Sequence, residues 1–121
     1  MLAAVRTREG KPVDLGRLAA AHRGSPRRYL EALRTGGLSA GLYRVTRGAE
    51  GEQRPHGEEE VYLVLEGRGR FRMGDEDFAV EPGYLFTVPA RVEHGFHSIE
   101  DDLLLLVLFA PPEGTMTRAP E

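Results

Sequence analysis

The sequence predicts an all-β domain, either an antiparallel sandwich or a barrel. From Gly37 onward, short β-prone runs separated by Gly, Pro and Asp recur about every ten residues, which is typical of such folds. No long helical pattern lies between the runs. This argues against a parallel sheet, because parallel strands need long crossover connections. The predicted strands are LSAGLYRV (38–45), EVYLVLEG (60–67), GRFRM (69–73), DFAV (77–80), YLFTVP (84–89), EHGFHSI (93–99) and DLLLLVLFA (102–110).

The residues before this pattern contain a predicted short helix. Asp14 is a favourable N-cap, and the apolar residues between Leu15 and His22 fall on one helical face. Gly24 would end this helix. The next segment, residues 25–33, has two interpretations: a second helix opened by Ser-Pro, or an extended strand added to a sheet edge. The sequence leaves both open.

Two turns and a tail complete the expected organisation. Residues 73–76, Met-Gly-Asp-Glu, predict a tight hairpin. In residues 81–83, Glu-Pro-Gly, the proline fixes φ and the glycine is free to take a positive φ. Residues 111–121 are rich in proline and carry no apolar pattern, so we expect a tail without a strand or helix.

Composition limits the classes of function. A chain of 121 residues is long enough for one core and too short for two, and 40% hydrophobic with 29% charged residues is typical of a soluble globular domain. No membrane-length apolar stretch and no secretory signal is present, so we expect a cytoplasmic protein without a membrane partner. A net charge of -3 and dispersed arginines give no support for nucleic-acid binding. Because there is no cysteine, a bound metal ion would need His and carboxylate ligands.

Two segments carry a family resemblance. PHGEEEVYLVLEGRGRF (55–71) and EPGYLFTVPARVEHGFHSI (81–99) resemble the two motifs of the cupin superfamily, in the order and spacing of its small single-domain bacterial members. The resemblance implies a cupin jelly roll, also called a double-stranded β-helix barrel, over residues 38–110. Residues 1–37 would form an N-terminal extension with the short helix, and residues 111–121 a C-terminal tail.

The first motif usually has two histidines separated by one residue, then a glutamate, then a glycine. Counting back from Gly67 matches the glutamate to Glu60 and one histidine to His56. The chain departs from the pattern at the other histidine. Either His56 is the second of the pair and Arg54 takes the first place, or His56 is the first and Glu58 takes the second. One of the four usual metal ligands is altered in both alignments.

The second motif runs from a Pro-Gly turn through a proline to a histidine. Pro82, Gly83, Pro89 and His94 fit that spacing without gaps. The resemblance therefore implies that His94, together with two residues of the first motif, binds one divalent metal ion.

The chemistry of these residues supports the same site. Two imidazoles and one carboxylate on an open site suit Fe, Mn, Ni, Co or Zn, without choosing among them. His56, Glu58 and Glu60 have the same parity, so an extended backbone would point them in one direction. His94 would reach them only if the barrel closes. Taken alone, a histidine beside three glutamates is more typical of a solvated loop, and the two motifs together favour the metal site.

Other side chains are weaker candidates. By parity, Tyr62 would share the cavity with Glu60, and Phe96 and Ser98 would share it with His94, although aromatic residues here can equally be barrel filling. Arg54 would meet a ligand carboxylate, and Glu58 would act as a fourth ligand or a proton acceptor. His97 differs in parity from His94 and is predicted to face away from the cavity.

Two functions follow from the resemblance. The first is a metal-dependent enzyme, dioxygenase-like or isomerase-like, that acts on a small oxygen-rich organic molecule. The second is a non-catalytic module or sensor that binds a small molecule. The resemblance also implies a homodimer, to which an added N-terminal strand or the run LLLLVLF could contribute.

Overall fold

A computed structural model describes residues 10–25, 28–49, 51–53 and 56–114 of the chain. These described residues form one helix and seven strands, and every strand pairing among them is antiparallel. The elements are α1 (Leu15–Arg23), β1 (Tyr29–Arg34), β2 (Ser39–Val45), β3 (Gly51–Gln53), β4 (Glu59–Met73), β5 (Glu76–Val80), β6 (Leu85–Val88) and β7 (His94–Ala110). Within the described residues, no helix is long and apolar enough to cross a membrane.

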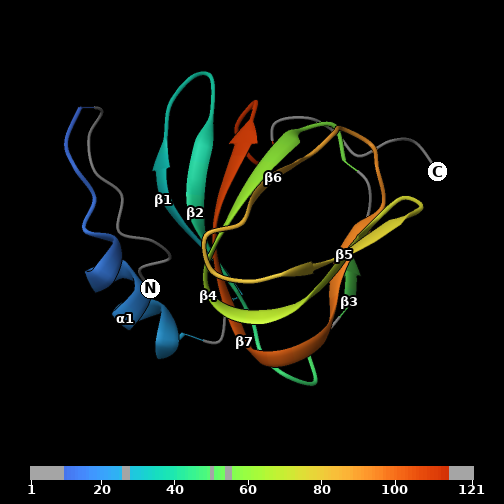
Figure 1. Cartoon of the computed structure of the whole chain (residues 1–121). Helices are drawn as coiled ribbons and strands as arrows, with labels where there is room; N and C mark the ends of the chain where they lie inside the picture. The colour runs from blue at the N-terminus through green and yellow to red at the C-terminus, as the bar shows by residue number, and fades with distance from the viewer. Residues whose placement is uncertain (1–9, 26–27, 50, 54–55, 115–121) are drawn as a thin grey trace.

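Two long strands, β4 and β7, build both halves of the barrel. The first half of β4 pairs with β6 and with the second half of β7, which in turn pairs with β2 and through it with β1. The second half of β4 pairs with β5 and with the first half of β7, which also pairs with β3. Figure 1 shows both strands bending around the interior. The all-β barrel predicted from the sequence is therefore confirmed.

Gly67 lies where β4 bends from one half of the barrel to the other. The pairing register of β4 with β7 shifts between Glu66 and Arg68, the two residues that flank Gly67. Its φ is +96°, and a Cβ placed there would collide with the backbone carbonyl of Asp102 and lie 2.8 Å from Leu103 Cα. A strand bend with a positive φ and a close backbone neighbour requires glycine.

The barrel encloses the main hydrophobic core, which is rich in aromatic side chains. Tyr62 and Phe71 from β4 and Phe96 from β7 are each at most 3% exposed, and their rings are in mutual contact. Phe78 and Phe86 close the group from β5 and β6. These rings fill one end of the interior and leave little room for water there.

Helix α1 lies outside the barrel and covers part of one sheet face (Figure 1). The Asp14 side chain caps it by accepting a hydrogen bond from the Arg17 N–H at 3.1 Å, and Gly24 follows its last residue, as predicted. Leu18 packs in a second cluster with Leu42 and Leu104 from the outward faces of β2 and β7. The helix thus adds stability without contributing to the interior.

The structure also resolves the sequence alternatives. Part of residues 25–33 lies in edge strand β1, so the strand interpretation is confirmed and the second helix is wrong. The hairpin at residues 73–76 joins β4 to β5 as predicted. The predicted strands 60–67 and 69–73 are one continuous strand, and so are 93–99 and 102–110, because the strands bend at these points without ending.

Gly67 and Gly83 have nearly equal φ angles, so their alanine variants distinguish the cost of a steric collision from the cost of backbone strain. We expect Gly67→Ala to lower the free energy of unfolding by more than about 3 kcal/mol, because the new methyl group meets the Asp102 backbone. Gly83→Ala, at φ +95° with nothing near its Cβ position, should cost only about 1 kcal/mol. Urea unfolding measures both. Equal losses in the two variants would contradict the assignment of Gly67 as a sterically restricted bend.

Candidate metal centre

Glu60 is the central residue of the site. It lies in the first half of β4, where it pairs with Val88 of β6 and Phe109 of β7. The alternating burial along this part of β4 turns its side chain inward, and the residue is 1% exposed. Its Oε2 accepts a hydrogen bond from the Tyr62 hydroxyl at 2.9 Å. A carboxylate is thereby held in the barrel, with Oε1 left to contact the histidines.

His94 reaches Glu60 from the other half of the barrel. It is the first residue of β7, paired with Gln53 of β3 and Met73 of β4, and it is 2% exposed. Its Nδ1 lies 2.9 Å from the Val92 carbonyl oxygen, which fixes the ring, and its Nε2 lies 2.9 Å from Glu60 Oε1. Barrel closure brings these two residues together, as the sequence analysis required.

His56 comes from the segment just before β4. The Arg91 N–H donates to its carbonyl oxygen at 2.7 Å, which ties this segment to the turn that precedes His94. The ring is held in the same way as that of His94: Nδ1 lies 3.1 Å from the Glu58 carbonyl oxygen and Nε2 lies 3.1 Å from Glu60 Oε1. Each histidine therefore uses Nδ1 to fix its ring and directs Nε2 toward the carboxylate.

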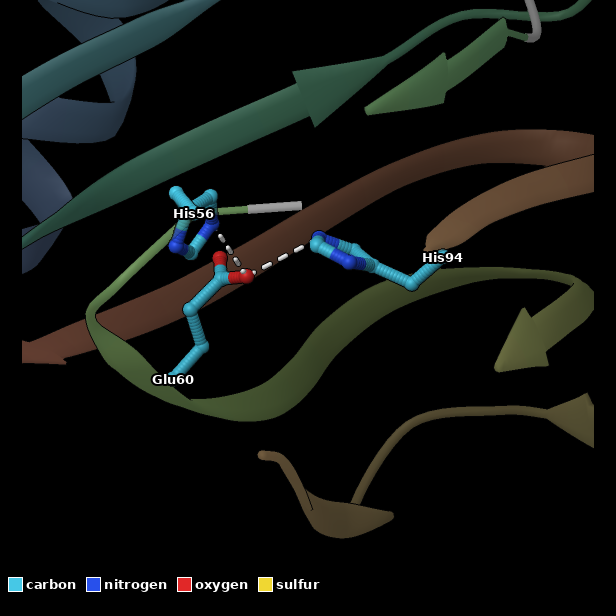
Figure 2. Close-up of side chains that lie close together, drawn as sticks. All are labelled: His56, Glu60 and His94. Carbon is cyan, nitrogen blue, oxygen red and sulfur yellow. Dashed lines mark hydrogen bonds and ion pairs between the residues drawn. The ribbon is translucent and has the colours of Figure 1, made fainter. Parts of the chain in front are cut away.

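One ligand atom from each of His56, Glu60 and His94 lies within 4.8 Å of the others. Figure 2 shows the two imidazoles approaching the carboxylate from different sides. Glu60 and His94 are buried and His56 is partly exposed, and such a set of two nitrogens and one oxygen directed at a common point fits a divalent transition-metal ion. The fixed Nδ1 atoms add the outer hydrogen bonds that usually accompany metal-binding histidines.

The electrostatics of the site depend on its hydrogen bonds. Burial alone would raise the pKa of Glu60, but the hydrogen bonds and charges of His56 and His94 outweigh it and lower the pKa to about 2. The hydrogen bond to Glu60 raises the pKa of His56 above its usual 6.5, although burial opposes that shift. The carboxylate is thus ionised at neutral pH and ready to bind a cation.

The surroundings of the three residues are aromatic. Phe71 and Tyr62 lie against the His94 ring, with centroids 5.9 and 6.4 Å away, and Phe109 lies 5.9 Å from the His56 ring. Two of the three predicted pocket residues, Tyr62 and Phe96, do face this interior. An apolar wall strengthens every polar interaction inside it, because it lowers the local dielectric constant.

Ser98, the third predicted pocket residue, does not face the interior. It is exposed, and its Oγ lies 3.0 Å from Nδ1 of His97, which itself pairs with Asp77 on the outer surface as expected for a residue facing away. Parity failed at Ser98 because its φ is +50°, which interrupts the strand alternation so that Ile99 is the next inward residue.

The two predicted catalytic residues have different outcomes. Arg54 lies outside the described residues. Glu58 is buried beside the site, yet it does not belong to the three-residue cluster: its Oε1 lies 3.1 Å from His56 Nδ1 and its Oε2 accepts a hydrogen bond from the Gly114 N–H at 3.0 Å. The alternation of side chains along a strand does not predict where Glu58 lies, because β4 begins only at Glu59 and Glu58 is outside the strand.

The histidine–glutamate contacts predict how the stability of the metal-free protein depends on pH. The lowered pKa of Glu60 adds stability that is complete above about pH 4.5 and is lost as the pH falls toward 2. The raised pKa of His56 adds stability that is complete below about pH 6.5 and is lost as the pH rises through the raised value. We therefore expect this contribution to be largest between these two values.

Urea unfolding in the presence of a chelator measures this profile when it is repeated from pH 3 to pH 9 in steps of about one pH unit. In Glu60→Gln the amide does not ionise, so we expect both limbs to flatten relative to the native protein. Profiles of the same shape in the two proteins would contradict the assigned contacts.

The chain is similar in sequence and in fold to known proteins. The family model for the cupin domain matches residues 41–110. The protein SCO3923 of Streptomyces coelicolor is 45% identical over 85 residues, which are 70% of this chain and 81% of that protein. TT1209 of Thermus thermophilus is 30% identical with a TM-score of 0.66, over 82% of this chain and 95% of the other.

A structure of the DMSP lyases RdDddP and RnDddQII is 26% identical with a TM-score of 0.65, over 77% of this chain and 52% of the other. Similar barrels therefore occur in enzymes. The match to the family model and the two motifs, one on β4 and one running through β6 to the start of β7, lead to one conclusion: this chain belongs to the cupin family.

Proposed function

We propose that this cupin binds one divalent metal ion through His56, Glu60 and His94, and that it uses the ion as an enzyme. The observation that carries the proposal is the convergence of two Nε2 atoms on one carboxylate oxygen, at 2.9 and 3.1 Å, inside the barrel. Fe, Mn, Ni, Co and Zn all accept such ligands, so the identity of the ion is left to experiment.

The need to stabilise buried charge supports a cation in this position. Glu60 is almost completely buried among aromatic rings, and an ionised carboxylate in such surroundings requires strong partners. In the metal-free protein the two Nε2 atoms can bond to this carboxylate only as N–H donors, whereas a divalent cation would bind the carboxylate and both Nε2 atoms directly. A nitrogen that binds an ion carries no proton, so uptake of the ion would release the protons of the two Nε2 atoms.

A bound ion with open positions would polarise an oxygen atom of a substrate or bind a small oxidant. We therefore propose a dioxygenase-like or isomerase-like reaction on a small oxygen-rich molecule. The residues of the chain would contribute in two ways. Tyr62 fixes the Glu60 carboxylate, and the aromatic rings of the core shield the site on its inner side. The resemblance to structures of lyases supports an enzymatic role.

A non-catalytic cupin that binds a small molecule is the second candidate, supported by the apolar and aromatic lining of the barrel.

For either role we propose a cytoplasmic homodimer without nucleic-acid or membrane partners, on the grounds given by the sequence. An apolar strip on the outer face of the sheet favours the dimer. Leu85 is 67% exposed there and pairs with Leu63, which pairs with Leu106.

Metal content tests the proposed site most simply. Protein purified without an affinity tag should contain about one transition-metal ion per chain by mass spectrometry. We expect His56→Ala, Glu60→Ala and His94→Ala to lose the ion, because each removes one of the three proposed ligands, which form the one cluster of this kind among the described residues. His97→Ala is the matched control, since His97 lies on the outer surface beside Asp77.

The control variant should keep its ion. Equal metal content in all five proteins would contradict the site, and so would a loss in His97→Ala as large as in His94→Ala. An absence of metal in every preparation, combined with binding of a small molecule, would favour the second candidate.

Tyr62 offers a milder test of how the carboxylate is held. Tyr62→Phe keeps the ring in the core and removes only the hydrogen bond to Glu60 Oε2. We expect about tenfold weaker metal binding with little change in stoichiometry, as is common when an outer partner of a ligand is lost. Competition with a chromogenic chelator measures the affinity. Native affinity in Tyr62→Phe would show that this hydroxyl does not position the carboxylate.

A further inference from the structure

We propose that Glu58 is a positioning residue that joins the segment after β7 to the imidazole of His56. The inference rests on the proposed function, in which His56 is a metal ligand, and extends it to residues outside the metal site. It assigns Glu58 a role that differs from the fourth ligand or proton acceptor expected from the sequence.

The two carboxylate oxygens of Glu58 have different partners. Oε1 lies 3.1 Å from Nδ1 of His56, whereas the other ring nitrogen, Nε2, faces Glu60. Oε2 accepts a hydrogen bond from the backbone N–H of Gly114 at 3.0 Å. Glu58 is only 3% exposed, so its carboxylate is largely shielded from bulk water and is a strong acceptor, although Gly114 itself is exposed.

The segment that contains Gly114 is itself attached to the barrel. The N–H of Glu113 donates to Oγ of Ser39 at 2.8 Å, and the guanidinium of Arg34 donates to the Glu113 carbonyl oxygen at 2.6 Å. Pro112 is buried. Residues 113 and 114 therefore connect the edge of β1 and the start of β2 to Glu58, and through Glu58 to the His56 ring.

His56 needs such support more than His94 does. His94 is part of strand β7, and the Val92 carbonyl fixes its Nδ1. His56 precedes β4 and belongs to no strand, so its ring depends on the carbonyl and the carboxylate of Glu58. Loss of the carboxylate would leave a weaker restraint on the ring and its Nε2 would be directed less well toward the ion.

The test compares four single variants and one double variant, all full-length, with native protein. Glu58→Gln and Glu58→Ala remove the charged acceptor, and Glu58→Gln keeps its shape in case the alanine variant folds poorly. Ser39→Ala loosens the attached segment without touching the site. Glu59→Gln is the matched control, because Glu59 is the neighbouring carboxylate and is exposed. Metal-free proteins are titrated with Co(II) against a chelator.

We expect Glu58→Ala to bind Co(II) about 10- to 100-fold more weakly at unchanged stoichiometry, the usual range for an outer partner of a ligand. Ser39→Ala should weaken binding about fivefold, the equivalent of one ordinary hydrogen bond, and should have no further effect in the Glu58→Ala background. Native affinity in Glu58→Ala would overturn the inference. Loss of stoichiometric binding at saturating Co(II) would also overturn it, because Glu58 would then be a direct ligand.

A second readout is independent of metal. In the metal-free protein, the ¹⁵N chemical shifts of the imidazole nitrogens report which nitrogen carries the proton and how strongly it is held. We expect Glu58→Gln to shift the signals of His56 and of the Gly114 amide and to leave those of His94 unchanged. Unchanged His56 signals would overturn the inference even if the native protein binds metal. If native protein binds no metal, the proposed function fails and this readout still decides whether Glu58 holds the ring.

Discussion

The contact between the Glu60 carboxylate and two imidazoles connects residues from opposite ends of the long β4–β7 pairing. Glu60 stands in the half formed with β6 and the end of β7, whereas His94 stands in the half formed with β3 and the end of β4. A buried carboxylate is tolerated only with strong partners, so the two halves must close accurately enough to bring Nε2 of His94 within 2.9 Å of it. The short distances between the Glu60 carboxylate and the two Nε2 atoms stabilise the metal-free site, and they also place the three ligand atoms where one cation could bind all of them.

That closure depends on how two strands bend. β4 and β7 run through both halves, and glycine at position 67 permits the bend in β4 next to the Asp102 backbone. The interior rings then fill the space behind the site, with Phe71 in contact with Tyr62, Phe96 and the His94 ring. Packing, strand geometry and site chemistry are therefore parts of one arrangement, in which the metal-site residues project from a rigid sheet.

The sequence predicted much of this arrangement because most of it follows from local rules. Turn residues, the N-cap at Asp14 and the two motifs located the helix, the hairpin and the three residues of the cluster. Two features around the site were out of reach. The positive φ of Ser98 interrupts the alternation on which parity depends. The position of Glu58 depends on the segment around Gly114, which is 56 residues away and carries no pattern of its own. Local patterns do not specify contacts of that kind.

The most direct test of the central claim is a crystal structure of metal-loaded protein with anomalous diffraction recorded at the absorption edge of the ion. We predict one anomalous peak bonded to Nε2 of His56, Nε2 of His94 and the carboxylate of Glu60, with both Nδ1 atoms still on the carbonyl oxygens of Glu58 and Val92. A peak elsewhere, or no peak while the carboxylate remains between the two histidines, would contradict the account.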